Sequence, residues 1–141
     1  MKNGWINEEL YQRIHTLMPI PSVDILPVHN KKLLLMRRNN EPGKNLWWPP
    51  GGRILVRETL EDAAKRELFE ETGLKPKSLT KVNVMSHFWP QYHFITTFFK
   101  ADVESDTIAL NSEHSEYRWI TTVDEKLHQY VKHMISESNI F

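Results

Sequence analysis

The chain has 141 residues, 40% of them hydrophobic and 26% charged, and its 18 Lys and Arg residues balance its 18 Asp and Glu residues. These values are typical of one globular domain over residues 1–141, without the basic surplus of nucleic-acid-binding proteins or the ~20-residue apolar run of a membrane span. The chain has no cysteine, which excludes disulfides and thiolate metal sites, and its first seven residues lack the apolar stretch of a secretory signal, so we expect a cytoplasmic protein without nucleic-acid or membrane partners.

Helices are expected at both ends of the chain. Asn7 can cap a first helix over about residues 8–18, where apolar side chains recur at helical spacing until two prolines stop it. A last helix is expected over about residues 124–138, capped by Thr121 or Thr122.

Strands are expected between these helices. Residues 22–29 and 32–37 are predicted as two strands joined by a tight turn, and Pro27 makes the first of them an edge or irregular strand. After a loop over residues 39–45, further strands are expected at residues 53–56, 77–89, 92–103 and 117–120. Mixed strands with helices before, between and after them predict an α/β or α+β fold.

The strongest chemical signal is a group of carboxylates on a central helix. Thr59 can cap this helix, and Gly73 suits the left-handed position that ends one. Glu67, Glu70 and Glu71 fall within an arc of about 100° on it, where like charges repel unless a cation lies between them. A hard divalent cation takes oxygen ligands and would turn the group into a Lewis-acid site.

A solvated charged face is the ordinary explanation for such a helix. The full pattern G-x5-E-x7-R-E-L-x-E-E-x-G-L, from Gly52 to Leu74, argues against it. Chance would match its seven Gly, Glu and Arg positions on the order of once in a hundred million starts. Small residues at Ala63 and Ala64 leave room beside the carboxylates, and Arg66 can orient one of them through its planar guanidinium.

This pattern is the Nudix box, and the chain resembles the Nudix hydrolase family over nearly its whole length. The resemblance implies the Nudix fold, an α/β/α sandwich around a mixed sheet, and a box that binds Mg²⁺ or Mn²⁺ and positions a diphosphate. It implies that Glu67, Glu70 and Glu71 are metal ligands, with the carbonyl of Gly51 as a further contact. It also implies that Glu67 or Glu70 activates water, with Arg66 in the same catalytic group.

Outside the box, the chain is similar to the GDP-mannose mannosyl hydrolase branch of that family. The similar stretches are Ser22–Ile25, the loop around Arg37, Trp47–Arg53, Ser86–Phe88 and Glu113–Ile120. Members of this branch release GDP and mannose by attack at the anomeric carbon of the sugar. The resemblance therefore implies a small nucleotide-sugar substrate, GDP-mannose above all, and a homodimer.

The same resemblance assigns the acid–base and metal-binding groups outside the box. His114 matches the general base that deprotonates water, a role suited to an imidazole near its ordinary pKa. Glu113 matches a metal ligand. A loop histidine is otherwise most often just exposed to solvent.

Four further residues are assigned to the substrate. Arg37 and Arg53 would stabilise the charge that develops on the leaving GDP, although Arg37 can instead pair with Glu41. Asp24 and His87 would hold sugar hydroxyls, because a lone carboxylate in an apolar strand is costly without partners. A purely structural histidine is the alternative for His87.

Two features depart from the mannosyl hydrolase branch. The chain keeps Glu67 and Glu70, which P–O-cleaving Nudix enzymes use, and its turn at Trp89–Gln91 is short, with Phe94 in place of a tyrosine. Three functions stay open: the mannosyl hydrolase, a pyrophosphatase that cleaves a P–O bond of a nucleotide sugar or nucleoside triphosphate, and a non-catalytic nucleotide-binding domain. The intact box argues against the third.

Overall fold

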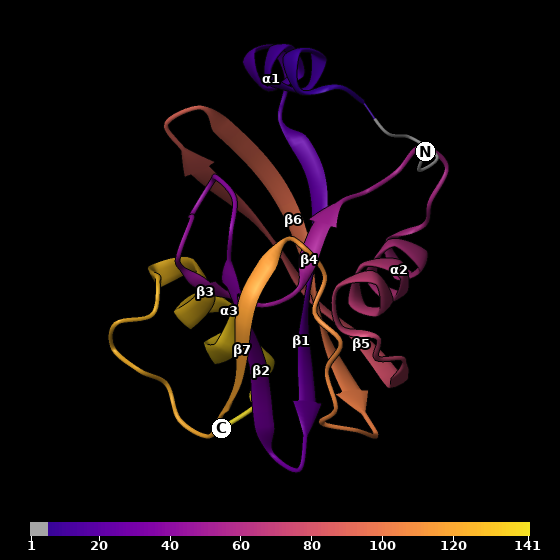
Figure 1. Ribbon diagram of the computed structural model, residues 1–141, viewed down its shortest axis with the longest axis vertical. Coiled ribbons are helices and arrows are strands. Elements are labelled where there is room, and N and C mark those ends of the chain that lie inside the picture. Colours follow the sequence, from indigo (N-terminus) through magenta and orange to yellow (C-terminus); the bar gives the residue numbers. More distant parts are fainter. Residues whose placement is uncertain (1–5) are drawn as a thin grey trace.

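A mixed β-sheet runs through the centre of the computed structural model, which describes residues 6–141 (Figure 1). In chain order the elements are α1 (Glu8–Leu17), β1 (Ile20–His29), β2 (Lys32–Arg38), β3 (Trp47–Trp48), β4 (Gly51–Arg53), α2 (Leu60–Thr72), β5 (Pro76–Trp89), β6 (Tyr92–Val103), β7 (His114–Ile120) and α3 (Gln129–Ser138). No helix in residues 6–141 is long and apolar enough to cross a membrane. Residues 1–5, part of the segment that lacks a secretory signal, lie outside the described residues.

Seven strands form the sheet. Their order is β3-β2-β1-β6-β5, with β4 also paired to β1 and β7 to β2. β1 and β6 run parallel, whereas the other pairs are antiparallel, so the sheet is mixed as expected. The register places Ser22 beside both Arg53 of β4 and Thr96 of β6, and Asp24 beside Gly51.

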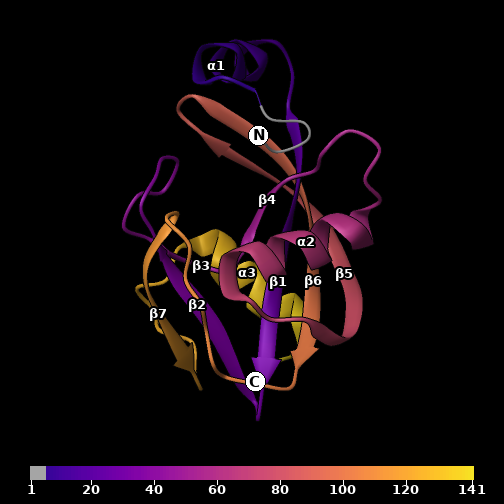
Figure 2. The ribbon, with the colours of Figure 1, turned by 45° about the vertical axis from the view of Figure 1, so that its right-hand side comes forward.

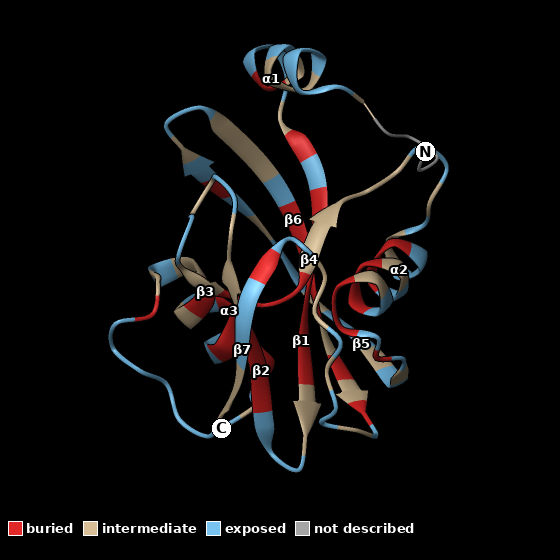
Figure 3. Ribbon diagram, viewed as in Figure 1, coloured by how far each residue is buried: buried red, intermediate tan, exposed pale blue. Residues whose placement is uncertain are grey.

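Helices α2 and α3 cover opposite faces of this sheet (Figure 2). Because side chains alternate along a strand, Val23 and Ile25 of β1 pack in one core with Leu68 of α2, whereas Leu26 packs in a second core with Met134 of α3. All five are fully buried, and each such side chain stabilises the fold by about 1.5–3 kcal/mol relative to exposure. The buried residues follow the strands and the inner side of α2 (Figure 3), which confirms the predicted α/β/α sandwich.

Pro27 does not make β1 an edge strand, so that alternative of the prediction is wrong, and only the irregular strand remains. β1 lies between β2 and β6. The N–H of Ile25 donates to the carbonyl of Pro50 on the β4 side, and Pro27, two residues on, faces the same side. The pairing of β1 with β2 is limited there to Val28 and His29, so the missing N–H of proline costs no ladder hydrogen bond.

Other elements differ from their predicted bounds. β3 is too short for its alternation to be recognised in the sequence, β4 begins at Gly51 rather than at residue 53, and β7 begins at His114 rather than at residue 117. α3 begins only at Gln129, because Nδ1 of His128 accepts a hydrogen bond from the N–H of Tyr130 and caps the helix. The predicted caps at Thr121 and Thr122 are therefore wrong.

Helix α1 lies outside the sandwich, at the tip of the β5–β6 hairpin (Figure 1). Asn7 caps it, as predicted, by accepting from the N–H of Leu10 at 2.8 Å. The helix packs through His15, whose ring meets Tyr92 and Phe94 edge-on with centroids 4.7 and 5.2 Å away. This contact brings one end of α1 to the rim of the pocket described next.

Candidate active site

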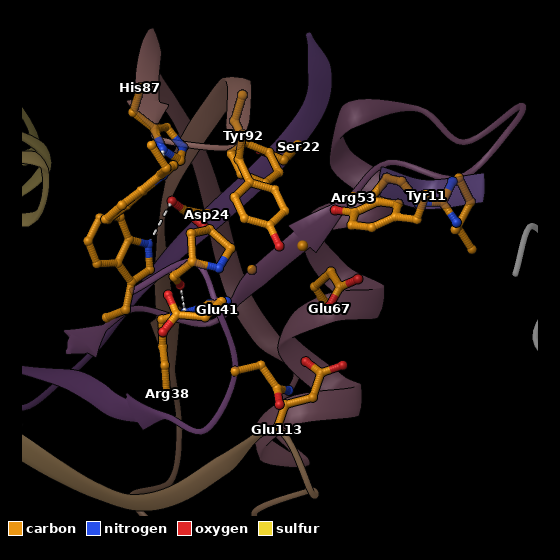
Figure 4. A pocket seen from close by; sticks show the side chains of 18 of the residues that line it. Tyr11, Ser22, Asp24, Arg38, Glu41, Arg53, Glu67, His87, Tyr92 and Glu113 are labelled. Atoms are coloured by element: carbon orange, nitrogen blue, oxygen red, sulfur yellow. Dashed lines mark hydrogen bonds between the residues drawn. The ribbon is translucent and has the colours of Figure 1, made fainter. Parts of the chain in front are cut away.

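A pocket of about 710 Å³ opens where β1, β4, β5 and β6 meet α1 and α2 (Figure 4). This volume lies within the range of small-molecule sites. Its charged and polar lining residues are Glu8, Tyr11, Ser22, Asp24, Arg38, Asn40, Glu41, Arg53, Arg66, Glu67, His87, Tyr92 and Glu113. Residues far apart in the sequence therefore converge on one cavity.

Helix α2 presents one of the three predicted carboxylates, Glu67, to this pocket. Its bounds match the prediction, because Thr59 Oγ1 accepts from the N–H of Asp62 at 3.1 Å and Gly73 takes the left-handed conformation with φ of 77°. Glu67 lines the pocket and is 7% exposed, and Glu71 is 1% exposed. Carboxylates buried this deeply need partners.

Arg66 supplies one of these partners, as the sequence predicted. Its guanidinium binds Glu58 through two hydrogen bonds of 2.5 and 2.8 Å and donates to Glu67 at 2.6 Å and to the carbonyl of Arg53 at 3.0 Å. Glu70 lies farther from it, at 3.4 Å. The planar fork of arginine thus ties α2 to the loop before it and to β4, and holds the Glu67 carboxylate in place.

Glu71 lies behind the turn that connects β3 and β4. Its Oε2 accepts from the N–H of Gly51 at 3.1 Å. Burial, followed by the negative charges of Glu67 and Glu113, holds the pKa of the Glu71 carboxyl well above its usual range. A hard divalent cation takes carboxylate oxygens as ligands and would relieve the repulsion between this buried acid and its two acidic neighbours.

These residues fit Mg²⁺ or Mn²⁺ by their chemistry rather than by preformed geometry. Within residues 6–141 no three acidic or histidine side chains are gathered into a metal centre. Glu67 and Glu113 line the pocket and Glu71 lies behind Gly51. Carboxylate oxygens are the donors such ions prefer, so we propose these three side chains, with the carbonyl of Gly51, as metal ligands. Glu70, also expected as a ligand, does not line the pocket and accepts from Arg66 instead.

Two glycines allow the close approach of β4 to its neighbours. A Cβ at Gly51 would lie 2.1 Å from Oδ1 of Asp24 and 2.3 Å from the carbonyl oxygen of Val23. A Cβ at Gly52 would lie 2.7 Å from Oε1 of Glu67. Any side chain there would displace either β1 or the pocket carboxylate.

His114 begins β7 and lies deeper than a solvent-exposed loop histidine would, at 5% exposure. Its Nε2 is 3.8 Å from Oε2 of Glu71, and its buried Nδ1 has no partner among the described residues. Burial, and then the charge of Arg38, lower the pKa of His114 to about 4, so the ring is neutral at pH 7 but does not have the ordinary pKa that the sequence prediction assumed for a general base. The preceding residue, Glu113, lines the pocket.

Asp24 faces the pocket, as predicted. It is 7% exposed, and its Oδ2 accepts from Nε1 of Trp48 at 3.2 Å. Burial raises the pKa of Asp24 to about 7, against the lowering effects of the Trp48 hydrogen bond and of Arg38. His87 also lines the pocket, but both of its ring nitrogens are engaged by protein groups, Trp89 and Thr96.

The arginines are placed differently from the sequence prediction. Arg53 lines the pocket, but Arg37 does not: it is half-exposed and pairs with Glu116 at 2.9 Å. Arg38 lines the pocket instead, with its Nε held by the carbonyl of Pro42 at 2.8 Å. The register between β2 and β7 shifts between residues 37 and 38, and such a bulge redirects the side chains that follow.

The fold and the carboxylate helix are those of a known class of protein. The chain belongs to the NUDIX domain family, whose model matches residues 18–136. It is 29% identical over 135 residues to the low-salt glycan biosynthesis protein Agl8 of Haloferax volcanii. The aligned region covers 90% of this chain and 86% of Agl8.

Two other similarities add to this. The ADP-ribose pyrophosphatase of Methanocaldococcus jannaschii is 39% identical over 89 residues, or 62% of this chain and 53% of that protein. A crystal structure of the MutT NUDIX hydrolase from Burkholderia pseudomallei superposes with a TM-score of 0.77 at 21% identity, over 85% of this chain and 98% of that one. The structural similarity confirms the fold, and the family match confirms a Nudix hydrolase.

Proposed function

We propose that this Nudix protein hydrolyses a nucleoside-diphosphate sugar in a divalent-metal-dependent reaction, with GDP-mannose as substrate and GDP and mannose as products. The observation that carries the proposal is the division of the pocket. Glu67 and Glu113 lie on the side of α2, where a metal-bound diphosphate would fit, whereas the Asp24 carboxylate lies at the other side, on the sheet (Figure 4). A pocket with a diphosphate end and a hydroxyl-binding end matches a sugar nucleotide.

The positive charges that line the pocket support this reading. Arg38 and Arg53 line the pocket and can stabilise negative charge on a leaving GDP. A bound divalent cation would supply Lewis-acid neutralisation of the same diphosphate. The similarity to Agl8, whose name places it in glycan biosynthesis, also favours a substrate that carries a sugar.

His114, which lies outside the pocket lining but beside the proposed metal ligand Glu71, is the base in the proposed attack of water at the sugar. A buried imidazole nitrogen without a protein partner, such as its Nδ1, is a place where a water can be held. In the proposed step His114 takes a proton from that water, the water oxygen bonds to the anomeric carbon, and the C–O bond breaks with its electron pair going to the β-phosphate oxygen of GDP. GDP is then the leaving group and needs no protonation by a carboxylic acid.

Cleavage of a P–O bond is the second candidate, and a different observation favours it. Glu67 lines the pocket directly, whereas His114 lies behind Glu71. Glu67 is therefore in a better position to meet a water near the diphosphate. The similarity to an ADP-ribose pyrophosphatase is consistent with such chemistry.

A substrate panel tests the proposal. Purified protein with Mg²⁺ is given GDP-mannose, other nucleoside-diphosphate sugars, ADP-ribose and nucleoside triphosphates, and the products are identified by chromatography. The highest kcat/KM is expected for GDP-mannose, with GDP and mannose as products. A preference for nucleoside triphosphates, or no turnover of any sugar nucleotide, would overturn it.

A further inference from the structure

Four side chains form a hydrogen-bonded row that ends in the pocket. The indole Nε1 of Trp89 donates to Nδ1 of His87 at 2.9 Å, and Nε2 of His87 lies 2.8 Å from Oγ1 of Thr96. Oγ1 of Thr96 lies 2.6 Å from Oγ of Ser22. Thr96 is fully buried, His87 and Ser22 are 6% exposed, and Ser22 lines the pocket beside Asp24.

The direction of each hydrogen bond in this row is fixed. An indole N–H can only donate, so Nδ1 of His87 accepts and its Nε2 carries the proton. Nε2 therefore donates to Thr96. Ser22 is the one acceptor that the structure shows for the Thr96 hydroxyl within residues 6–141, so Thr96 donates to Ser22. The hydroxyl hydrogen of Ser22 is then free to point into the pocket.

The ring of His87 is uncharged at neutral pH, so its two hydrogen bonds keep these directions. Burial, followed by the charges of His128, Arg38 and His93, lowers the pKa of His87 to about 4. The neutral ring has one donor and one acceptor, which is what the row needs. Since both nitrogens are used inside the protein, His87 has no polar atom left for a ligand.

We infer that Ser22, and not His87, donates a hydrogen bond to the sugar of the substrate, and that Thr96 and His87 are positioning residues that orient the Ser22 hydroxyl. This inference rests on the proposed function. Ser22 and Asp24 are two residues apart on β1 and face the same side, so their side chains are about 7 Å apart along the strand. One donates and the other accepts, a pair suited to two oxygens of a single hydroxyl-rich ring.

Kinetics with GDP-mannose and inhibition by GDP test the contact. Ser22→Ala is expected to raise KM roughly 5- to 10-fold, the loss of one hydrogen bond, with kcat and the inhibition constant of GDP unchanged. Thr96→Val should raise KM by a similar factor, and the KM of the Ser22→Ala/Thr96→Val double variant should be no higher than that of either single variant. Thr96→Ser keeps the hydroxyl and should have the wild-type KM. Ser86→Ala, on the exposed side of β5, is the matched control.

Several outcomes would overturn the inference. An unchanged KM in Ser22→Ala would show that Ser22 does not contact the sugar. An equal rise in the GDP inhibition constant would show that Ser22 contacts the nucleotide instead. Additive effects in the double variant would show that Thr96 does not act through Ser22. The tautomer of His87, read from ¹⁵N shifts of the ligand-free protein at pH 7, tests the row without any substrate: protonated Nε2 is expected, and protonated Nδ1 contradicts it. If wild type does not act on GDP-mannose, the proposed function and the sugar contact fail together, while the tautomer still reports on the row.

Discussion

Alanine at position 52 would place a methyl group against the carboxylate of Glu67. The added Cβ lies 2.7 Å from Oε1 and 2.8 Å from Cδ of Glu67, whereas ordinary van der Waals contact begins at 3.4 Å and extends to 4 Å. The carboxylate must therefore move by about 1 Å, and a misplacement of that size costs roughly 100-fold in rate. Because the clash is with the end of a flexible side chain, we expect less than about 1 kcal/mol of lost stability.

Alanine at position 51 is expected to lower the stability of the fold. Its Cβ would lie 2.3 Å from the backbone carbonyl oxygen of Val23 and 2.1 Å from Oδ1 of Asp24. Backbone in a central strand cannot give way cheaply, so overpacking costs about 1–3 kcal/mol. At the upper end this lowers Tm by roughly 10 °C.

Both variants are measured for kcat with GDP-mannose and Mg²⁺ and for thermal unfolding by circular dichroism. Gly52→Ala should keep its Tm and lose kcat, whereas Gly51→Ala should lose Tm. Wild-type kcat in Gly52→Ala would show that the position of Glu67 does not matter for turnover. Equal losses of Tm in the two variants would refute the contrast between side-chain and backbone clashes.

Other predictions follow from the same site. Arg38→Ala should lower kcat/KM by about 10²-fold, the loss of one charge-stabilising donor, whereas Arg37→Ala should leave it within twofold of wild type; the reverse result would restore the assignment of Arg37. His114→Gln should lower kcat by about 10²–10⁴-fold, the contribution of a general base, with the Mg²⁺ concentration for half-maximal activity unchanged. EDTA should abolish turnover and Mg²⁺ or Mn²⁺ restore it, and activity that persists in EDTA would exclude the metal. The folded-state pKa of His87, about 4, lies below the ordinary 6.5, so this residue's contribution to stability is present above pH 6.5 and is lost as pH falls toward 4. Between pH 6.5 and 4, the free energy of unfolding measured in urea should therefore fall by up to about 3 kcal/mol more for wild type than for His87→Phe. The same pH dependence in both proteins would contradict the lowered pKa of His87.

Features with local causes could be predicted from the sequence. Helix α2 has its cap at Thr59 and its left-handed glycine at Gly73, and both lie where the sequence placed them. The long β5–β6 hairpin was predictable from its alternation and from the break at Pro90. Asp24 could be assigned to the pocket because an isolated acid in an apolar strand needs a polar environment.

Features set by tertiary pairing could not be predicted. The two-residue strand β3 exists only through its pairing with β2. The bulge between Arg37 and Arg38 depends on the register of β7, about 80 residues later in the chain, so the sequence does not say which arginine faces the pocket. The sequence alone places Ser22 only within a stretch similar to the mannosyl hydrolases, because its role depends on Thr96 and His87 from the neighbouring hairpin.

The position of the oxygen label after hydrolysis of GDP-mannose in ¹⁸O-water tests the proposed reaction most directly. The label is read by mass spectrometry of both products, with Mg²⁺ present and the protein-free reaction as control. Attack at the anomeric carbon predicts label in free mannose and none in GDP. Label in a phosphate group, with GMP and mannose 1-phosphate as products, would contradict this account and assign the chemistry to P–O cleavage.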